Sequence, residues 1–376
     1  MGYMGAKSDV PGARRAVRPS HALLVIPLGL IILIMIADVF TGRSSQLGPL
    51  LIVAPAVTAS FAGPRLTGLM GALAVAGQVL SAIAEGSGLT AGLEIQVIGL
   101  AVVSGFLVAL RAVRDLRERQ LAHTRSIAAA AQEVLIRPLP RRAGPLRIAT
   151  DYIAAELDAR VGGDLFAAVR ADRVTRVIIG DVRGKGLPVI KDTSLLLGAF
   201  HGSAYRNLSL PHMAIHLGNA MYWNWANAAA DDPEADESFV TVLLLDFPDN
   251  VGRVETISCG HPPPLLLHEG KISALDARSP GLPLGITVPT VDQYVVDTFS
   301  FVAGDVLLLY TDGVIETASP NGTFYPLSKR MAAWDGTGGP ERLVRHVHED
   351  LLSHARGPLG DDAALIAIQR LADRTE

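Results

Sequence analysis

Residues 177–186 read VIIGDVRGKG, and residues 307–314 read LLLYTDGV. In each stretch a short apolar strand ends in an Asp beside a Gly. The same combination occurs in VGGDLF at 161–166 and in GDDAALIAI at 360–368. Because glycine permits close backbone approach, each stretch can present its carboxylate at the edge of a sheet. One such Asp is ordinarily a turn residue, whereas four separate ones indicate a shared site.

The four carboxylates belong to Asp164, Asp181, Asp312 and Asp361. If they converge, their like charges need neutralising. Hard divalent cations with oxygen ligands do this, and Mg²⁺ or Mn²⁺ fits the ligand set better than zinc. The sequence has no HExxH motif, and its ten histidines are scattered. These residues therefore predict a site for Mg²⁺ or Mn²⁺.

Other chemistries are disfavoured by the same segments. The stretch GDVRGKGLP lacks the GxxxxGK[ST] spacing of a nucleotide-binding loop, and no GxSxG nucleophile motif occurs. Cys259 is the only cysteine, which excludes an internal disulfide. Its surroundings, ISCGHPPPLLL, offer few backbone N–H donors to a phosphate, so a thiol nucleophile is not expected. For the neighbouring His261 two interpretations stay open, a structural turn and a substrate contact, and the turn is favoured.

The C-terminal two thirds of the chain alternates short strands with a few helices. Strands are expected at 146–152, 164–170, 174–181, 239–246, 252–259, 263–267, 294–299, 305–311 and 363–369. Helices are expected at 186–206, 210–227 and 339–355. Strands in hairpin-like succession with grouped helices predict an α+β layered domain, here assigned to 138–376.

The N-terminal part is unusually apolar for a chain of 376 residues with a mean hydropathy of +0.33. Four apolar runs follow a tail at 1–21, and they cover 22–40, about 47–63, 66–84 and 91–110. Each is near the roughly 20 residues that a membrane-spanning helix needs. We therefore predict a four-helix transmembrane region at 22–110. A cleaved signal peptide for the first run and buried helices of a soluble protein are the alternatives.

The basic residues between these runs predict the orientation. Nine fall on one side of the proposed membrane, and Arg43 alone falls on the other. The nine are Lys7, Arg14, Arg15, Arg18, Arg65, Arg111, Arg114, Arg117 and Arg119. The positive-inside rule then predicts a multi-pass cell-membrane protein with both termini in the cytoplasm. The formal net charge of −4 argues against nucleic acid as a partner.

Residues 111–137 contain no Gly or Pro and predict a single connector helix that ends before Pro138. Its apolar residues recur in alternating steps of three and four, as in a dimeric coiled coil. The seam comprises Val113, Leu116, Gln120, His123, Ile127, Ala130 and Val134. Because Gln120 and His123 are polar, a solvated single helix stays an alternative to the homodimer.

Taken in order, the motifs resemble those of the SpoIIE/RsbU-type branch of the protein phosphatase 2C (PPM) family. The matching stretches are AQEVLIRPLP at 131–140, VGGDLF, IGDVRGKG, SFVTVLLLD at 238–246, GHPPPLLL at 260–267, GLPLGI at 281–286, GDVLLLYTDGVIETASPNG at 304–322 and GDDAALIAI. The resemblance covers about 130–370 and leaves the apolar region out. Ser258-Cys259 stands where the family often has Asn-Ala.

The resemblance implies an α-β-β-α sandwich and hydrolysis of phosphoserine or phosphothreonine on a protein by metal-bound water. It implies two Mn²⁺ or Mg²⁺ ions, with Asp181 bridging them and the Val182 carbonyl on one. Asp312 and Asp361 would hold the other ion, with Asp362 as competitor for Asp361. Asp164 would orient the water or join the ligands.

In that family the substrate is often a phosphorylated anti-sigma-factor antagonist, and the organism would be a bacterium. The helix at 187–206 would act as a switch for the metal site. The alternative function is a pseudophosphatase that transmits a membrane signal without turnover.

Overall fold

The computed structural model describes residues 21–41, 47–84, 91–135, 137–155, 162–184, 186–231, 238–334 and 338–372. The expected tail at 1–21 lies almost entirely outside this set, as does Lys185 of the VIIGDVRGKG motif. The chain forms two compact units, Met1–His123 and Thr124–Glu376, which are described separately below.

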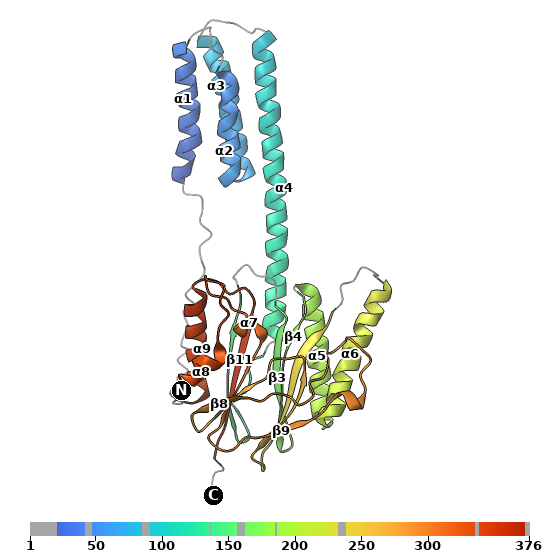
Figure 1. Ribbon diagram of the computed structural model, residues 1–376. Coiled ribbons are helices and arrows are strands. Elements are labelled where there is room, and N and C mark those ends of the chain that lie inside the picture. The colour runs from blue at the N-terminus through green and yellow to red at the C-terminus, as the bar shows by residue number, and fades with distance from the viewer. Residues whose placement is uncertain are drawn as a thin grey trace, which may run out of the picture. The chain divides into compact units, whose positions relative to one another are not determined.

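The first unit consists of apolar helices that lie side by side (Figure 1). They are the short 3-10 helices η1 (His21–Leu24) and η3 (Gly48–Ile52) and the α-helices α1 (Val25–Thr41), α2 (Val53–Phe61), α3 (Pro64–Ala84) and α4 (Ala91–Leu135). Their small common core contains Ile31, Leu51, Ala54, Met70, Ala74 and Leu100. Outward-facing side chains such as Leu33 and Phe106 are each 65% exposed although they are apolar.

Two stretches of this unit are long and apolar enough to cross a membrane, Pro64–Ile83 and Gly92–Gln120. The apolar helices at Val25–Asp38 and Gly48–Phe61 are shorter than such a span. Length and composition therefore support two of the four expected spans.

The fourth apolar run and the connector form one helix. α4 continues for 45 residues without a break between 110 and 111. The absence of Gly and Pro over 111–135 explains this continuity, and the helix ends three residues before Pro138. The boundary between the two compact units falls inside this helix.

The second unit contains two antiparallel sheets in the described residues. One has the order β1 (Arg142–Ala143), β2 (Leu146–Ile153), β11 (Ala363–Arg370), β10 (Val306–Tyr310), β7 (Leu265–His268) and β8 (Lys271–Ala274). The other has the order β3 (Asp164–Ala171), β4 (Val174–Val182), β5 (Val240–Pro248), β6 (Arg253–Cys259) and β9 (Asp297–Ser300). Strands β1 and β8 were not expected from the sequence, because β1 has only two residues and β8 is largely exposed and lacks an apolar run.

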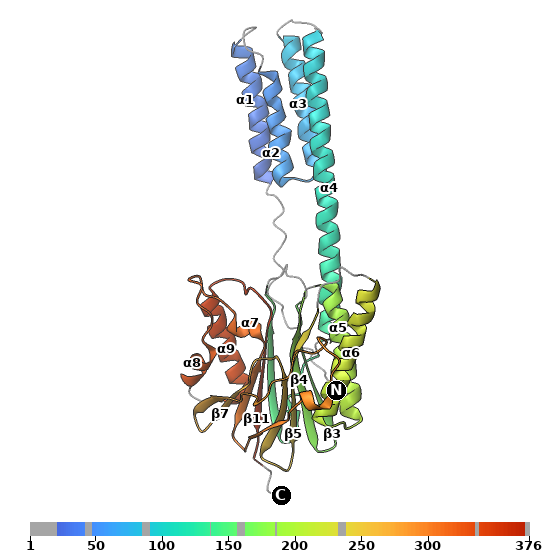
Figure 2. The ribbon, with the colours of Figure 1, turned by 45° about the vertical axis from the view of Figure 1, so that its right-hand side comes forward.

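Helices cover both outer faces of the sheets (Figure 2). α5 (Leu187–Tyr205) and α6 (Leu210–Asp231) cover the β3–β9 sheet; α7 (Asp312–Ile315), α8 (Leu327–Ala332) and α9 (Gly339–Ala355) lie by the other. A short 3-10 helix, η4 (Val291–Gln293), precedes β9.

Alternation along the strands creates the layers. In β11, Ala364 and Ile366 face the core between the sheets, while Leu365 faces the helices. In β4, Ile178 packs toward α5 and α6, and Ile179 packs between the sheets. Both faces of each sheet are thus covered, and the expected α-β-β-α sandwich is confirmed.

Candidate metal centre

A row of three polar residues crosses one end of the β3–β9 sheet. Asp164 on β3 lies directly opposite Asp181 on β4, and Asp181 lies directly opposite Thr241 on β5. Directly opposed residues of antiparallel strands share a face, with their Cβ atoms about 4.5–5.5 Å apart. Because Val240 and Val242 pack toward the helices, the row faces the other sheet.

Thr311 connects this row to the opposite sheet. Its hydroxyl donates to Asp164 Oδ2 at 2.8 Å and accepts the Ala364 N–H at 2.9 Å. Thr311 is fully buried between the end of β10 and the start of α7. The next residue, Asp312, is therefore held at the same end of the sandwich as Asp164.

The two adjacent aspartates at the start of β11 have different environments. Asp362 is buried and accepts hydrogen bonds from the Ala155 N–H at 2.8 Å and the Tyr152 hydroxyl at 2.5 Å. Asp361 is exposed, and its Oδ1 accepts the Asp362 N–H at 3.0 Å. The contacts of Asp362 occupy both its oxygens, which disfavours Asp362 as a metal ligand.

Gly163 marks a small space that two oxygen atoms share. A Cβ atom on Gly163 would lie 2.1 Å from the Val182 carbonyl oxygen and 2.2 Å from Asp181 Oδ1. Both oxygens therefore face the position where a side chain would otherwise be. The Gly163 carbonyl accepts the Val182 N–H at 3.0 Å, which fixes this approach. Only glycine leaves the space open.

The carboxylates perturb one another. Burial raises the pKa of Asp164 well above its usual value; Asp181, Asp312 and Asp362 raise it further, and the Thr311 hydrogen bond opposes the rise. Burial also raises the pKa of Asp312, with a further rise from Asp361. Uncompensated negative charge thus gathers where the two sheets meet, which is the condition that a bound cation relieves.

The donor set fits Mg²⁺ or Mn²⁺ better than a softer metal. The facing donors are carboxylate oxygens and one backbone carbonyl, the ligand type that hard cations take. In the described part of the chain, no three His, Cys, Asp or Glu side chains meet as a ready-made metal group. Mg²⁺ in proteins is usually held by one or two carboxylates and keeps several waters.

Two other residues from the sequence analysis have no direct part in such a site. Cys259 is buried, and burial raises the pKa of its thiol to about 12, so no reactive thiolate forms. His261 is only 5% exposed, which agrees with a structural turn and not with a substrate contact. Thr311, Tyr152 and Gly163 were not singled out from the sequence. Thr311 lies in the TDG stretch and Gly163 in the VGG stretch, so only these two had a signal in the sequence.

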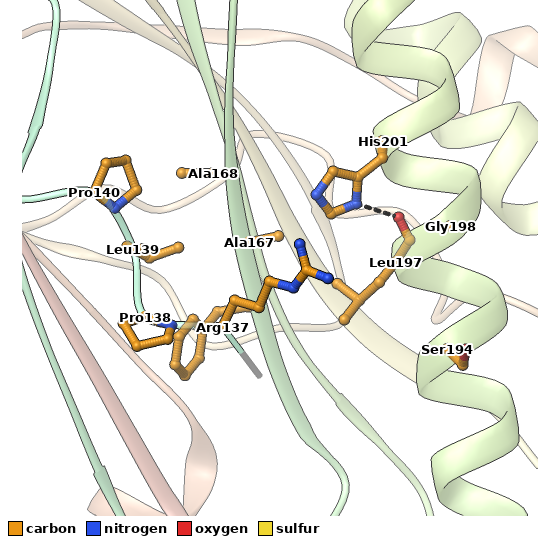
Figure 3. Close-up of a pocket in the computed structure, with 11 residues that line it drawn as sticks. Arg137, Pro138, Leu139, Pro140, Ala167, Ala168, Ser194, Leu197, Gly198 and His201 are labelled. Atoms are coloured by element: carbon orange, nitrogen blue, oxygen red, sulfur yellow. Dashed lines mark hydrogen bonds between the residues drawn. The ribbon is translucent and has the colours of Figure 1, made fainter. Parts of the chain in front are cut away.

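A cavity of 490 Å³ lies beside β3 (Figure 3). The segment 137–140 forms one wall, and Leu197, Gly198 and His201 of α5 form the other. In Figure 3 the His201 ring turns back toward its own helix, where Nδ1 contacts the Leu197 carbonyl at 2.7 Å. The segment 137–140 and α5 are therefore separated by a cavity where they face each other.

Comparisons with known proteins agree with this geometry. A family profile described as "Stage II sporulation protein E (SpoIIE)" matches residues 171–371, more than half of the chain. The phosphoserine phosphatase RsbU of Bacillus subtilis is 23% identical over 276 residues, covering 72% of this chain and 77% of RsbU. Protein IcfG of Synechocystis sp. is 23% identical over 228 residues, covering 58% of this chain and 34% of IcfG.

Two solved structures share the fold with a TM-score of 0.50 each. The RsbU and RsbW domains of Rv1364c from Mycobacterium tuberculosis are 24% identical, with 63% of each chain covered. The phosphatase domain of SpoIIE from Bacillus subtilis, solved with a fragment of its regulatory domain, is 16% identical. That match covers 60% of this chain and 63% of the solved one. The chain belongs to the SpoIIE family, a group of metal-dependent protein serine/threonine phosphatases.

Proposed function

We propose that this protein is a membrane-attached phosphatase that removes phosphate from a phosphoserine or phosphothreonine of a cytoplasmic regulatory protein. The observation that carries the proposal is the shared space beside Gly163. There Asp181 and the Val182 carbonyl converge, and Thr311 ties the same end of the sheet to the segment bearing Asp312. RsbU, whose name describes a phosphoserine phosphatase, matches most of this chain.

In this proposal the chain holds two divalent cations, Mn²⁺ or Mg²⁺. Asp181 would be a ligand of both ions. The Val182 carbonyl would be a further ligand of one ion, and Asp312 and Asp361 would hold the other. When bound, the two ions activate the attacking water and neutralise the phosphoryl oxygens. Asp164, buried and fixed by Thr311, would orient the water from beside the ligands. Cys259 is buried with a raised thiol pKa, so the chain offers no reactive thiol there.

The substrate surface would include the residues that follow Val182. Arg183 is exposed, and its backbone N–H donates to the Phe239 carbonyl at 3.0 Å. Its guanidinium carbon lies 5.2 Å from the centre of the Phe239 ring. A guanidinium in this position suits a phosphoryl group because it pairs two N–H groups with two oxygens. Solved relatives include joined RsbU and RsbW domains. We take a phosphorylated anti-sigma-factor antagonist as the substrate class.

The experiment measures phosphate release from a serine-phosphorylated antagonist protein by the full chain in detergent micelles, with and without Mn²⁺. We expect metal-dependent release that a chelator abolishes. The Arg183→Ala variant should raise KM for the phosphoprotein while binding Mn²⁺ normally. A chain that binds Mn²⁺ but releases no phosphate from any phosphoserine or phosphothreonine protein would favour the pseudophosphatase alternative.

The membrane attachment, orientation and oligomeric state are also part of this proposal. Four apolar segments would cross the bilayer with both termini in the cytoplasm.

The connector part of α4 would pair two copies of the chain. Leu116 is 60% exposed, so its side chain can pack against a second copy. Sedimentation of the full chain carrying Leu116→Asp and Ile127→Asp should show a smaller species than the parent. A monomeric parent would reject the homodimer.

Regulation would act through α5. This helix begins at Leu187, five residues after Val182, and its middle part, from Ser194 to His201, borders the cavity that the segment 137–140 also lines. A movement of paired connectors would change this contact and shift the order of the metal site. The effector would contribute only its differential affinity for the two states.

A further inference from the structure

His261 lies where the chain leaves β6 and enters the prolines at 262–264. The preceding Gly260 has a φ of +73°, and a Cβ atom there would lie 2.8 Å from the Pro283 ring. Gly260 also forms a parallel bridge with Val242 of β5. The Ser258 hydroxyl donates to the His261 carbonyl at 3.2 Å. The turn is therefore tightly specified, and it buries the imidazole.

The imidazole contacts both sheets at the end that carries the aspartates. Its Nδ1 lies 3.3 Å from the Thr241 hydroxyl, and Thr241 is the residue directly opposite Asp181 in the β4–β5 register. On the other side the ring meets the backbone of Tyr310, the last residue of β10. Tyr310 stands two residues before Asp312. One side chain thus touches the cross-strand neighbour of Asp181 on one sheet and the end of the strand that leads to Asp312 on the other.

The ring is neutral in this position. Burial lowers the pKa of His261 to about 3, although the Tyr310 backbone opposes the shift. Its Nε2 is buried and has no well-formed hydrogen bond in the described part of the chain. Such an atom in a native structure calls for a reason. A neutral imidazole has one donor and one acceptor nitrogen, so its two nitrogens can face Thr241 on one sheet and the Tyr310 backbone on the other without adding charge.

We propose that His261 is a positioning residue of the metal centre, which sets the separation between Asp181 on β4 and Asp312 at the start of α7 through Thr241 and Tyr310. The inference rests on the proposed function. It differs from a role in folding alone, because a positioning residue changes metal affinity even where the fold is intact. Outer partners of metal ligands typically alter metal affinity by about 10- to 100-fold when they are removed.

The test uses the full chain in detergent micelles and measures Mn²⁺ affinity directly by electron paramagnetic resonance titration, beside thermal unfolding in chelator. We expect His261→Phe, which keeps the ring and removes both nitrogens, to weaken Mn²⁺ binding about 10- to 100-fold. His261→Asn, which retains a polar atom near Nδ1, should recover part of the affinity. Thr241→Val should resemble His261→Phe, and the two together should be no worse than either alone.

The matched control is Tyr294→Phe, which also removes a polar atom from a buried ring, but in the core beneath α5 and α6. It should leave Mn²⁺ affinity unchanged. A His261→Phe variant that unfolds earlier yet binds Mn²⁺ as tightly as the parent would overturn the inference. A parent that binds no Mn²⁺ would overturn the inference and the proposed function together. A parent that binds Mn²⁺ without hydrolysis would reject only the function, since the affinity comparison still decides the role of His261.

Discussion

The Thr311 hydroxyl donates to Asp164 Oδ2 at 2.8 Å and at the same time accepts the Ala364 N–H at 2.9 Å. Asp164 begins a strand of one sheet, and Thr311 follows a strand of the other. The bond therefore joins the two halves of the sandwich inside the candidate site. It also satisfies one oxygen of a carboxylate that is 3% exposed.

Replacing Thr311 with Val removes this bond and keeps the shape of the side chain. A buried carboxylate oxygen and the Ala364 N–H then lose a partner, so we expect the free energy of unfolding to fall by about 1–3 kcal/mol. Phosphatase activity should fall by about 10- to 100-fold. Thr311→Ser retains the hydroxyl and should stay near the parent in both. Denaturant unfolding measures the stability of both variants, and phosphate release measures their activity. Equal activity of the Val and Ser variants would contradict the role of Thr311 in positioning Asp164.

The aspartates should differ in their importance. Asp181→Asn should reduce activity by more than about 100-fold, beyond the loss typical of an outer partner, because it removes a ligand that both ions share. Asp312→Asn and Asp361→Asn should each reduce activity and Mn²⁺ affinity with little change in stability. Asp362→Asn should instead lower stability, since the Tyr152 and Ala155 contacts depend on its charge. Full activity of Asp181→Asn would reject the two-ion mechanism.

Substitutions at two glycines test whether the space beside Gly163 binds metal ions. In Gly163→Ala the new Cβ would collide with the Val182 carbonyl oxygen and Asp181 Oδ1. We expect a loss of about 1–3 kcal/mol of stability together with a loss of Mn²⁺ affinity. Gly198→Ala in α5 is the control: its Cβ would meet nothing within 4 Å. That change should stabilise the protein by about 0.5–1 kcal/mol. Unaltered Mn²⁺ binding by Gly163→Ala would show that ions do not use this space.

The pair of His268 and Asp305 predicts a pH dependence away from the site. The hydrogen bond to Asp305, with Nδ1 to Oδ1 at 2.6 Å, raises the pKa of His268 above its usual 6.5. The folded state thus holds the proton more tightly than the unfolded state. The stabilisation is complete below pH 6.5 and is lost as the pH rises through the folded-state pKa. The melting temperatures of the parent and His268→Gln should therefore differ most near pH 5.5 and converge near pH 9. A gap that widens with pH would contradict the pairing.

Reporter fusions test the membrane topology. Fusions after residue 20, near 64 and after 115 should report cytoplasm, whereas fusions near 44 and 88 should report the outside. The reason is the nine-to-one distribution of basic residues between the two sides. An external signal after residue 115 would overturn both the orientation and the cytoplasmic substrate. If the fusion near 44 reports cytoplasm and the fusion near 88 reports the outside, only the two longer helices, α3 and α4, cross the membrane.

Much of the fold follows from local patterns in the sequence. Short apolar runs at 174–181 and 363–369, bounded by Gly, Asp or other polar residues, identify β4 and β11, and the runs are nearly continuous because one face packs on helices and the other on the partner sheet. The aspartates at strand ends identify the candidate ligands for the same reason, since the end of a strand is a local feature. The run without Gly or Pro over 111–137 identifies a helix, but its fusion with the fourth apolar segment appears only in the structure.

What only the tertiary structure decided depends on contacts between residues far apart in the chain. Asp361 and Asp362 are adjacent and chemically identical, and only the approach of Tyr152 and Ala155, more than 200 residues earlier, makes one structural and leaves the other exposed. The burial of His261 and the reach of Thr311 to Asp164 likewise depend on how one sheet packs on the other. Strand patterns specify which segments are apolar, but they carry no information on the register between two sheets. That register is set by packing over the whole sandwich, and it decides which polar groups meet.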